Sequence, residues 1–204
     1  MTIYIFFKIF TVCLLGAMSP GPSMVVVINN AIFKNRFHGI LTSLGHGIGI
    51  SVYALFAVLG IALIIKTNLH IFNGIKFLSI IFLIYLGVKS LLNKSDLDFN
   101  KNSLKNGIAS FLQGLNISLL NPKIFIWFIA IYSQFMSVNN NLFFNTTLIL
   151  TAGLVDAVWY ITLTLLVTSN IALDFFKNKN ILLQKFIGSI FIIIGAILLA
   201  EMIF

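Results

Sequence analysis

Long apolar runs separated by short polar stretches make up nearly the whole of this chain. A helix needs about 20 mostly apolar residues to cross the hydrocarbon layer of a bilayer, and the runs reach that length. The pattern predicts six membrane spans over residues 3–33, 39–65, 74–92, 108–135, 142–168 and 181–204. It predicts short connections at residues 34–38, 66–73, 93–106, 136–141 and 169–180. We expect an all-α membrane protein with a single integral membrane domain over residues 1–204.

Proline interrupts two of these six spans. The first contains Pro20-Gly21-Pro22, and the fourth contains Asn121-Pro122. Proline removes a backbone donor and clashes with the preceding turn, and glycine adds freedom, so each helix should break there. In lipid, a break persists only where protein buries it or where it lines a cavity. Each break by itself is equally compatible with a packing kink that carries no chemistry.

The two breaks also suggest an internal repeat. Pro22 and Pro122 lie about 100 residues apart, and Gly87 and Gly195 hold similar places in spans three and six. Three spans per half would give the halves opposite orientations in the membrane. Inverted repeats with a broken helix in corresponding positions indicate a transporter site near the bilayer midplane. The sequence thus predicts two inverted three-helix repeats, about 1–100 and 105–204, with chance similarity between Ile- and Leu-rich helices as the alternative.

Composition supports the membrane assignment and suggests an orientation. Hydrophobic residues make up 59% of the chain and charged residues 9%, and the mean hydropathy is +1.06. The net charge of +8 therefore indicates loop topology rather than nucleic-acid binding. Nine lysines and arginines fall in or beside the first, third and fifth connections, against three at the N-terminus and beside the second and fourth. We expect the odd-numbered connections in the cytoplasm and both termini outside it.

Two charged residues stand out because of their places within predicted spans. Asp156 is in the middle of span five, and Lys123 follows the break in span four. A charge at the bilayer centre costs about 2.5–3.5 kcal/mol on insertion scales, so such residues are functional candidates. Asp156 could relay a proton or cation or bind a substrate amine, or it could pair with Lys123 to fix helix packing. Lys123 could equally extend its ammonium to the membrane interface.

Other polar residues surround these candidates. Gly45 and Gly49 lie one helical turn apart and favour close helix packing, and His46 is beside them. Histidine exchanges a proton near neutral pH, so His46 could carry a proton or simply bond in the packing interface. Amides at Asn29 and Asn30, after the first break, and at Asn121, in the second, could bond freed backbone groups or a ligand.

Several other chemistries lack their sequence signals. Three scattered histidines and the single Cys13 offer no ligand spacing for a metal and no disulfide framework. The sequence has no phosphate-binding Gly-Lys-Ser/Thr loop and no Gly-x-Ser-x-Gly or His-Glu-x-x-His motif. We therefore expect neither an enzyme nor a resident cofactor.

Four motifs in order along the chain carry a family resemblance. They are Met18-Ser19-Pro20-Gly21-Pro22, Gly45-His46 with Gly49, Tyr85-Leu86-Gly87, and Leu120-Asn121-Pro122-Lys123. Together they resemble the lysine exporter (LysE/RhtB) family of bacterial amino-acid exporters, and Asp156 with Trp159 is similar to the acidic position of that family. The connection after span one lacks the Gly-Arg pair that is common there. The resemblance implies a multi-pass protein of the bacterial inner membrane that exports an amino acid or a derivative, uses the proton motive force and forms a homodimer.

The expected function is therefore secondary export from the cytoplasm. The two breaks should meet near the midplane, where half-helix ends can hold a substrate carboxylate and Asp156 can hold its ammonium or a proton. The expected substrate and proton path comprises Asp156, Lys123, Asn121, Pro122, Pro20, Gly21, Pro22, His46, Asn29 and Asn30. The alternatives are export of another small solute or cation, and a membrane assembly subunit that transports nothing.

Overall fold

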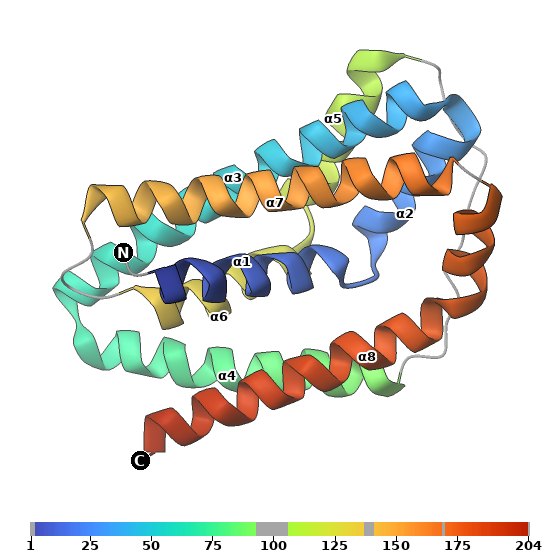
Figure 1. The fold of residues 1–204 in the computed structure, drawn as a ribbon. Helices are drawn as coiled ribbons and strands as arrows, with labels where there is room; N and C mark the ends of the chain where they lie inside the picture. The colour runs from blue at the N-terminus through green and yellow to red at the C-terminus, as the bar shows by residue number, and fades with distance from the viewer. Residues whose placement is uncertain (1–2, 93–105, 137–140, 169, 204) are drawn as a thin grey trace.

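The computed structural model describes residues 3–92, 106–136, 141–168 and 170–203, and all regular structure within these ranges is helical (Figure 1). The helices are α1 (Ile3–Met18), α2 (Pro22–Asn29), the π-helix η1 (Asn30–Lys34), α3 (Arg36–Thr67), α4 (Leu69–Leu92), α5 (Gly107–Leu119), α6 (Pro122–Phe135), α7 (Leu142–Val167) and α8 (Asn170–Ile203). Four helices contain spans long and apolar enough to cross a membrane, and two bent pairs bring the total to six. The prediction of an all-α membrane protein is confirmed.

Both predicted helix breaks are present. The chain bends by 69° between α1 and the α2–η1 segment, and by 57° between α5 and α6. Pro22 begins α2 and Pro122 begins α6, which is the helix position that tolerates a missing N–H. The proline positions therefore set where each second half-helix starts.

Three predicted connections are wrong, because the structure makes them mostly helical. Only Asn35 separates η1 from α3, whereas a connection over residues 34–38 was expected. Only Asn68 separates α3 from α4, whereas a connection over residues 66–73 was expected. Helix α8 begins at Asn170, eleven residues before the predicted start of span six. Hydropathy marks the part of a helix that suits lipid, and polar residues can extend a helix beyond that part. Most of the 93–106 connection, with its lysines, lies outside the described residues.

The helices form three layers (Figure 1). Helices α3 and α7 lie on one side, α1 and α6 in the middle, and α4 and α8 on the other side. The most extensive packing joins α3 to α5, α3 to α7, and α4 to α8. The start of α1 and the end of α8 lie at the same end of the bundle, as an even number of crossings requires. The two breaks thus lie between the outer layers of helices, with Ser19 and Asn121 buried and Pro22 and Leu120 exposed.

Glycines bring α3 and α7 into backbone contact. A Cβ atom built on Gly47 would lie 2.7 Å from Cβ of Ala157 and 2.8 Å from the carbonyl oxygen of Gly153. A Cβ on Gly153 would lie 2.9 Å from the carbonyl oxygen of Gly47 and 3.2 Å from Cβ of Ser51. Each glycine therefore packs against the glycine of the other helix and against the residue one helical turn after that glycine. Small residues permit such close crossings in membranes, where van der Waals packing rather than hydrophobic exclusion joins helices.

Helices α4 and α8 cross in the same reciprocal manner. A Cβ on Gly87 would lie 2.6 Å from Cγ1 of Ile192, and a Cβ on Gly195 would lie 2.5 Å from Cγ1 of Ile84. Gly87 and Gly195 are 108 positions apart, and so are Ile84 and Ile192. The same glycine–isoleucine contact thus occurs twice, with the two helices exchanged.

Candidate functional site

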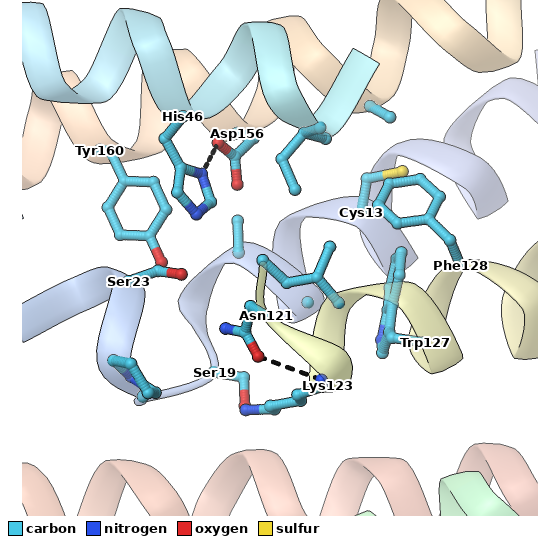
Figure 2. Close-up of a pocket in the computed structure, with 17 residues that line it drawn as sticks. Cys13, Ser19, Ser23, His46, Asn121, Lys123, Trp127, Phe128, Asp156 and Tyr160 are labelled. Carbon is cyan, nitrogen blue, oxygen red and sulfur yellow. Dashed lines mark hydrogen bonds and ion pairs between the residues drawn. The ribbon is translucent and has the colours of Figure 1, made fainter. Parts of the chain in front are cut away.

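The two helix breaks border one internal cavity, which Figure 2 shows in close-up. Its volume is about 60 Å³, room for a handful of water molecules. The residues that line it come from α1, both breaks, α3, α6 and α7: Cys13, Gly16, Ala17, Ser19, Gly21, Pro22, Ser23, His46, Ile50, Asn121, Lys123, Ile124, Trp127, Phe128, Ala152, Asp156 and Tyr160. All but Pro22 are buried or half-buried, so the cavity lies inside the bundle.

A histidine–aspartate pair forms one polar wall. The Nδ1 atom of His46 on α3 lies 2.6 Å from Oδ2 of Asp156 on α7, and both residues are buried. The His46 ring also meets the edge of the Tyr160 ring, with centroids 4.8 Å apart. His46 Nε2 is buried without a hydrogen-bond partner. Figure 2 shows Nε2 and the second carboxylate oxygen of Asp156 facing the cavity, where a ligand could bond to them.

The packing of α3 on α7 creates this pair. His46 is next to Gly47, and Asp156 is three residues after Gly153, so it shares a helical face with that glycine. Gly47 and Gly153 are in backbone contact at the crossing. The close approach of the two backbones therefore places a short aspartate within reach of the histidine ring.

Lys123 forms a second polar wall and joins the two breaks. Its Nζ atom donates to Ser19 Oγ at 2.7 Å and to the carbonyl oxygen of Pro20 at 3.4 Å. A Cβ atom built on Gly21 would lie 3.8 Å from the same Nζ. The side chain of Asn121 caps α6 by accepting from the backbone N–H of Lys123 at 3.1 Å. This wall therefore carries a half-buried cation held by neutral oxygen atoms.

The N-terminus of α2 opens beside this cation. Gly21 occupies the N-cap position and supplies no side-chain cap, although the first turn of a helix has N–H groups without intrahelical partners. The hydroxyl of Ser23, in that first turn, is buried, and Figure 2 shows it beside the hydroxyl of Tyr160. Helix N-termini attract anions through these donors and the helix dipole. Together with Lys123, the α2 N-terminus can bind a carboxylate.

Apolar side chains complete the cavity. Trp127 and Phe128 of α6 pack edge to face with centroids 5.1 Å apart, and Cys13 lies next to Phe128 in Figure 2. Gly16 gives the indole its space, because a Cβ there would lie 2.6 Å from Cζ2 of Trp127. This wall suits an uncharged, apolar ligand group.

The structure brings together most of the residues that the sequence predicted for the site. Those that line the cavity are Asp156, Lys123, Asn121, Gly21, Pro22 and His46. Pro20 contributes its carbonyl oxygen to Lys123, and Pro122 contributes the start of α6. Asp156 pairs with His46, so the structure does not contain the alternative arrangement in which Asp156 pairs with Lys123. Sequence reasoning could not choose between the two cations without knowing which helices touch.

Asn29 and Asn30 lie away from the cavity. Asn30 Nδ2 donates to Thr42 Oγ1 at 2.7 Å and to Gln113 Oε1 at 2.9 Å, in a separate polar cluster. Asn29 Oδ1 is buried without a hydrogen-bond partner, and the residue is not part of the cavity lining. Both residues follow the first break by about two helical turns, which moves them along α2 and into η1.

Eleven of the seventeen lining residues were missed from the sequence, and Ser23, Trp127 and Tyr160 are among them. Ser23 directly follows the Pro-Gly-Pro break, Trp127 lies one turn after Lys123, and Tyr160 lies one turn after Asp156. The one-turn spacing from a candidate charge could have indicated the two aromatic residues, because residues four apart share a helical face. Ser23 offered no such signal beyond its neighbours.

Comparisons with known proteins agree with this architecture. The family model for LysE type translocators matches residues 14–202. The uncharacterized membrane protein YrhP of Bacillus subtilis is 31% identical over 191 residues, which cover 86% of this chain and 89% of that protein. Leucine efflux proteins of Salmonella choleraesuis and Salmonella typhimurium are each 31% identical over 122 residues, 58% of this chain and 57% of theirs. No solved structure matches. The chain therefore belongs to the LysE type translocator family.

Proposed function

We propose that this protein exports a neutral amino acid from the bacterial cytoplasm and is driven by the proton motive force. One observation carries the proposal: the two helix breaks enclose a cavity with a carboxylate on one wall and an ammonium on another. An amino acid is a zwitterion with the same two charges in complementary positions. Membership of a translocator family supports transport in place of enzymatic chemistry.

The substrate carboxylate binds Lys123, Ser23 and the first-turn N–H groups of α2. Its ammonium binds the free oxygen of Asp156. Its side chain lies against Trp127 and Phe128. A charged side chain would find no counterion in this arrangement, because His46 already occupies the other oxygen of Asp156. The name of the leucine efflux relatives agrees with an apolar side chain.

Competition for Asp156 couples the proton to the substrate. With the substrate ammonium bound, the Asp156 carboxylate is ionised. After the substrate leaves to the outside, a proton from that side binds the His46–Asp156 pair and neutralises it. When the site faces the cytoplasm again, the proton leaves and the next substrate binds. One proton thus enters for each amino acid exported.

Two inverted repeats explain the reciprocal helix contacts. Gly47 and Gly153 meet each other, and the Gly87–Ile192 contact has its counterpart in Gly195–Ile84. A pseudo-two-fold axis through both crossings would produce these exchanges, and it would place the two breaks opposite each other near the bilayer midplane.

The positive-inside rule supplies the orientation. Lys34 and Arg36 lie at the opposite end of the bundle from the two termini, and Lys89 lies in the last turn of α4 at that same end (Figure 1). Basic residues accumulate in cytoplasmic loops, so this end faces the cytoplasm and both termini lie outside.

Transport by the purified protein in proteoliposomes tests the proposal. Vesicles loaded with labelled leucine should release it faster when the outside is made acidic, and a protonophore should remove the acceleration. Leucinamide lacks the carboxylate and 4-methylpentanoate lacks the ammonium, so neither should be released faster than from protein-free vesicles. If no neutral amino acid is released above the protein-free rate by folded protein, the proposed function is wrong.

A further inference from the structure

A second polar cluster lies outside the cavity, at the far end of the α2–η1 segment. Its members are Asn30, Lys34, His38, Thr42, Ser110 and Gln113. The α2–η1 segment runs from Pro22 to Lys34, so at 1.5 Å per residue Asn30 and Lys34 lie about 12 Å and about 18 Å from the break. The cluster therefore lies between the cavity and the end of the bundle that carries Arg36.

Hydrogen bonds in this cluster tie η1 to α5. Lys34 Nζ donates to Ser110 Oγ at 3.0 Å and to Gln113 Oε1 at 3.3 Å. Asn30 Nδ2 donates to the same Gln113 oxygen at 2.9 Å. The Ser110 hydroxyl also lies 3.1 Å from His38 Nδ1. Gln113 and Ser110 thus hold two side chains of η1 that lie one turn apart.

The cation in this cluster is covered and held by neutral groups. Lys34 has 7% of its surface exposed. Among the side chains that the structure describes, the only ion pair is that of His46 with Asp156, and none of these carboxylates neutralises Lys34. Hydrogen bonds between an ion and a neutral group are weaker than those between two ions of opposite charge. Lys34 is therefore held by two neutral acceptors, Ser110 and Gln113.

Packing shows which part can move. Helices α3 and α5 are joined by backbone contacts, since a Cβ atom on Gly45 would clash with the carbonyl of Phe111 and one on Gly114 with that of Thr42. The α2–η1 segment instead begins at the break with Gly21 and ends in a π-helix at Asn35. Small backbone segments at element ends absorb hinge motion, and π-helical turns occur often at functional sites. The segment also packs its apolar side chains on α7, where Met24, Val27 and Ile28 are buried, so a swing from Gly21 has to move these side chains along α7 while α3 and α5 stay together.

We propose that Lys34 and Asn30 form a latch that closes the cytoplasmic end of the cavity by fastening the α2–η1 segment to Gln113 and Ser110 of α5. Release of the latch lets the segment swing and opens the cavity to the cytoplasm. The inference rests on the proposed function in taking the cavity as the transport site. The neutral acceptors keep the latch reversible, because a carboxylate in their place would lock it.

Cys13 provides a direct reporter of the latch. It is the only cysteine in the chain and it lines the cavity, so its modification by a membrane-impermeant methanethiosulfonate measures access to the cavity. Arg36 lies at the same end of the bundle as Lys34. In the double variant Cys13→Ser/Arg36→Cys, the face of the vesicle from which the introduced cysteine is modified is therefore the face nearest the latch. Lys34→Met should raise the rate of Cys13 modification from that face about tenfold. Lys34→Arg should keep the wild-type rate, and so should Lys89→Met, which removes an exposed lysine of α4.

For a second variant we expect the rate of Cys13 modification to change in the opposite direction. Gln113→Glu places a carboxylate 3.3 Å from Lys34 Nζ, so it should lock the latch and lower the modification rate at least several-fold. The double variant Lys34→Met/Gln113→Glu should modify as fast as Lys34→Met alone. In a misfolded variant, Cys13 would be modified faster from both faces of the membrane. If Lys34→Met gives that result, the latch proposal is wrong. An unchanged rate for Lys34→Met, or a faster rate for Gln113→Glu, would also contradict the proposal. The modification assay needs no substrate, so it tests the latch separately from amino-acid export. Either proposal can be wrong while the other is right.

Discussion

Removing the charge of Asp156 is the sharpest test of the central site. Asp156→Asn keeps the size of the side chain, and its amide oxygen can still accept from His46 Nδ1–H across the same 2.6 Å contact. A hydrogen bond to an ionised group contributes about 1.5–3 kcal/mol and a neutral one about 0.5–1.5 kcal/mol. The variant should therefore lose about 1 kcal/mol of stability and stay folded in the membrane.

Transport should fall far more than stability. Two opposite unit charges 4 Å apart attract by about 4 kcal/mol at the effective dielectric constant of partly buried sites. The asparagine loses this attraction for the substrate ammonium, and it also loses the group that takes up the proton. Desolvation offsets part of the attraction, so we expect proton-driven efflux to fall at least about 100-fold.

The assay is efflux of labelled leucine from proteoliposomes, with size-exclusion chromatography in detergent to confirm folding. Glu201→Gln is the matched control, because it removes an exposed carboxylate near the end of α8, away from the cavity, and should leave efflux unchanged. Efflux by folded Asp156→Asn within twofold of the wild type would refute the role of this carboxylate in binding and coupling.

Two further substitutions test the other wall and the helix crossing. Lys123→Met removes the cation that faces the substrate carboxylate, so the KM for leucine should rise at least about tenfold. The control Lys185→Met, on the exposed face of α8, should leave the KM unchanged. Equal KM values for the two variants would exclude Lys123 from the site. Gly153→Val would push into the carbonyl of Gly47 and should cost about 1–3 kcal/mol, measured as a lower unfolding temperature in detergent. Gly60→Val is its control, because nothing lies within 4 Å of the added atom, and equal losses in both variants would contradict the packing.

The broken spans were predictable because their causes are local. Bilayer thickness sets how many apolar residues a span needs, and a proline breaks a helix whatever surrounds it. For the same reason Pro20, Gly21, Pro22, Asn121 and Pro122 could be named as break residues from the sequence. The polar residues of 34–38, 66–73 and 169–180 were misjudged, since hydropathy does not report where a helix ends in water.

The partners of the buried polar groups were not predictable, and the amides show why. Asn121 stays at its break and caps α6, which follows from its position before Pro122. Asn30 looked equivalent by the same local criterion, yet it bonds Gln113, which lies 83 positions away on α5. Whether an amide serves the cavity or a separate cluster depends on which helix happens to lie beside it.

By itself, the sequence determined that the chain crosses a membrane, that two spans break at proline, and that one acid and one base lie at membrane depth. Only the tertiary structure decided that Asp156 pairs with His46 and that Lys123 bridges to Ser19 and Pro20. The physical reason is that spans and breaks follow from hydrophobicity and backbone geometry along the chain. Ion pairs follow from helix rotation and crossing, which backbone contacts between residues far apart in sequence set in this protein.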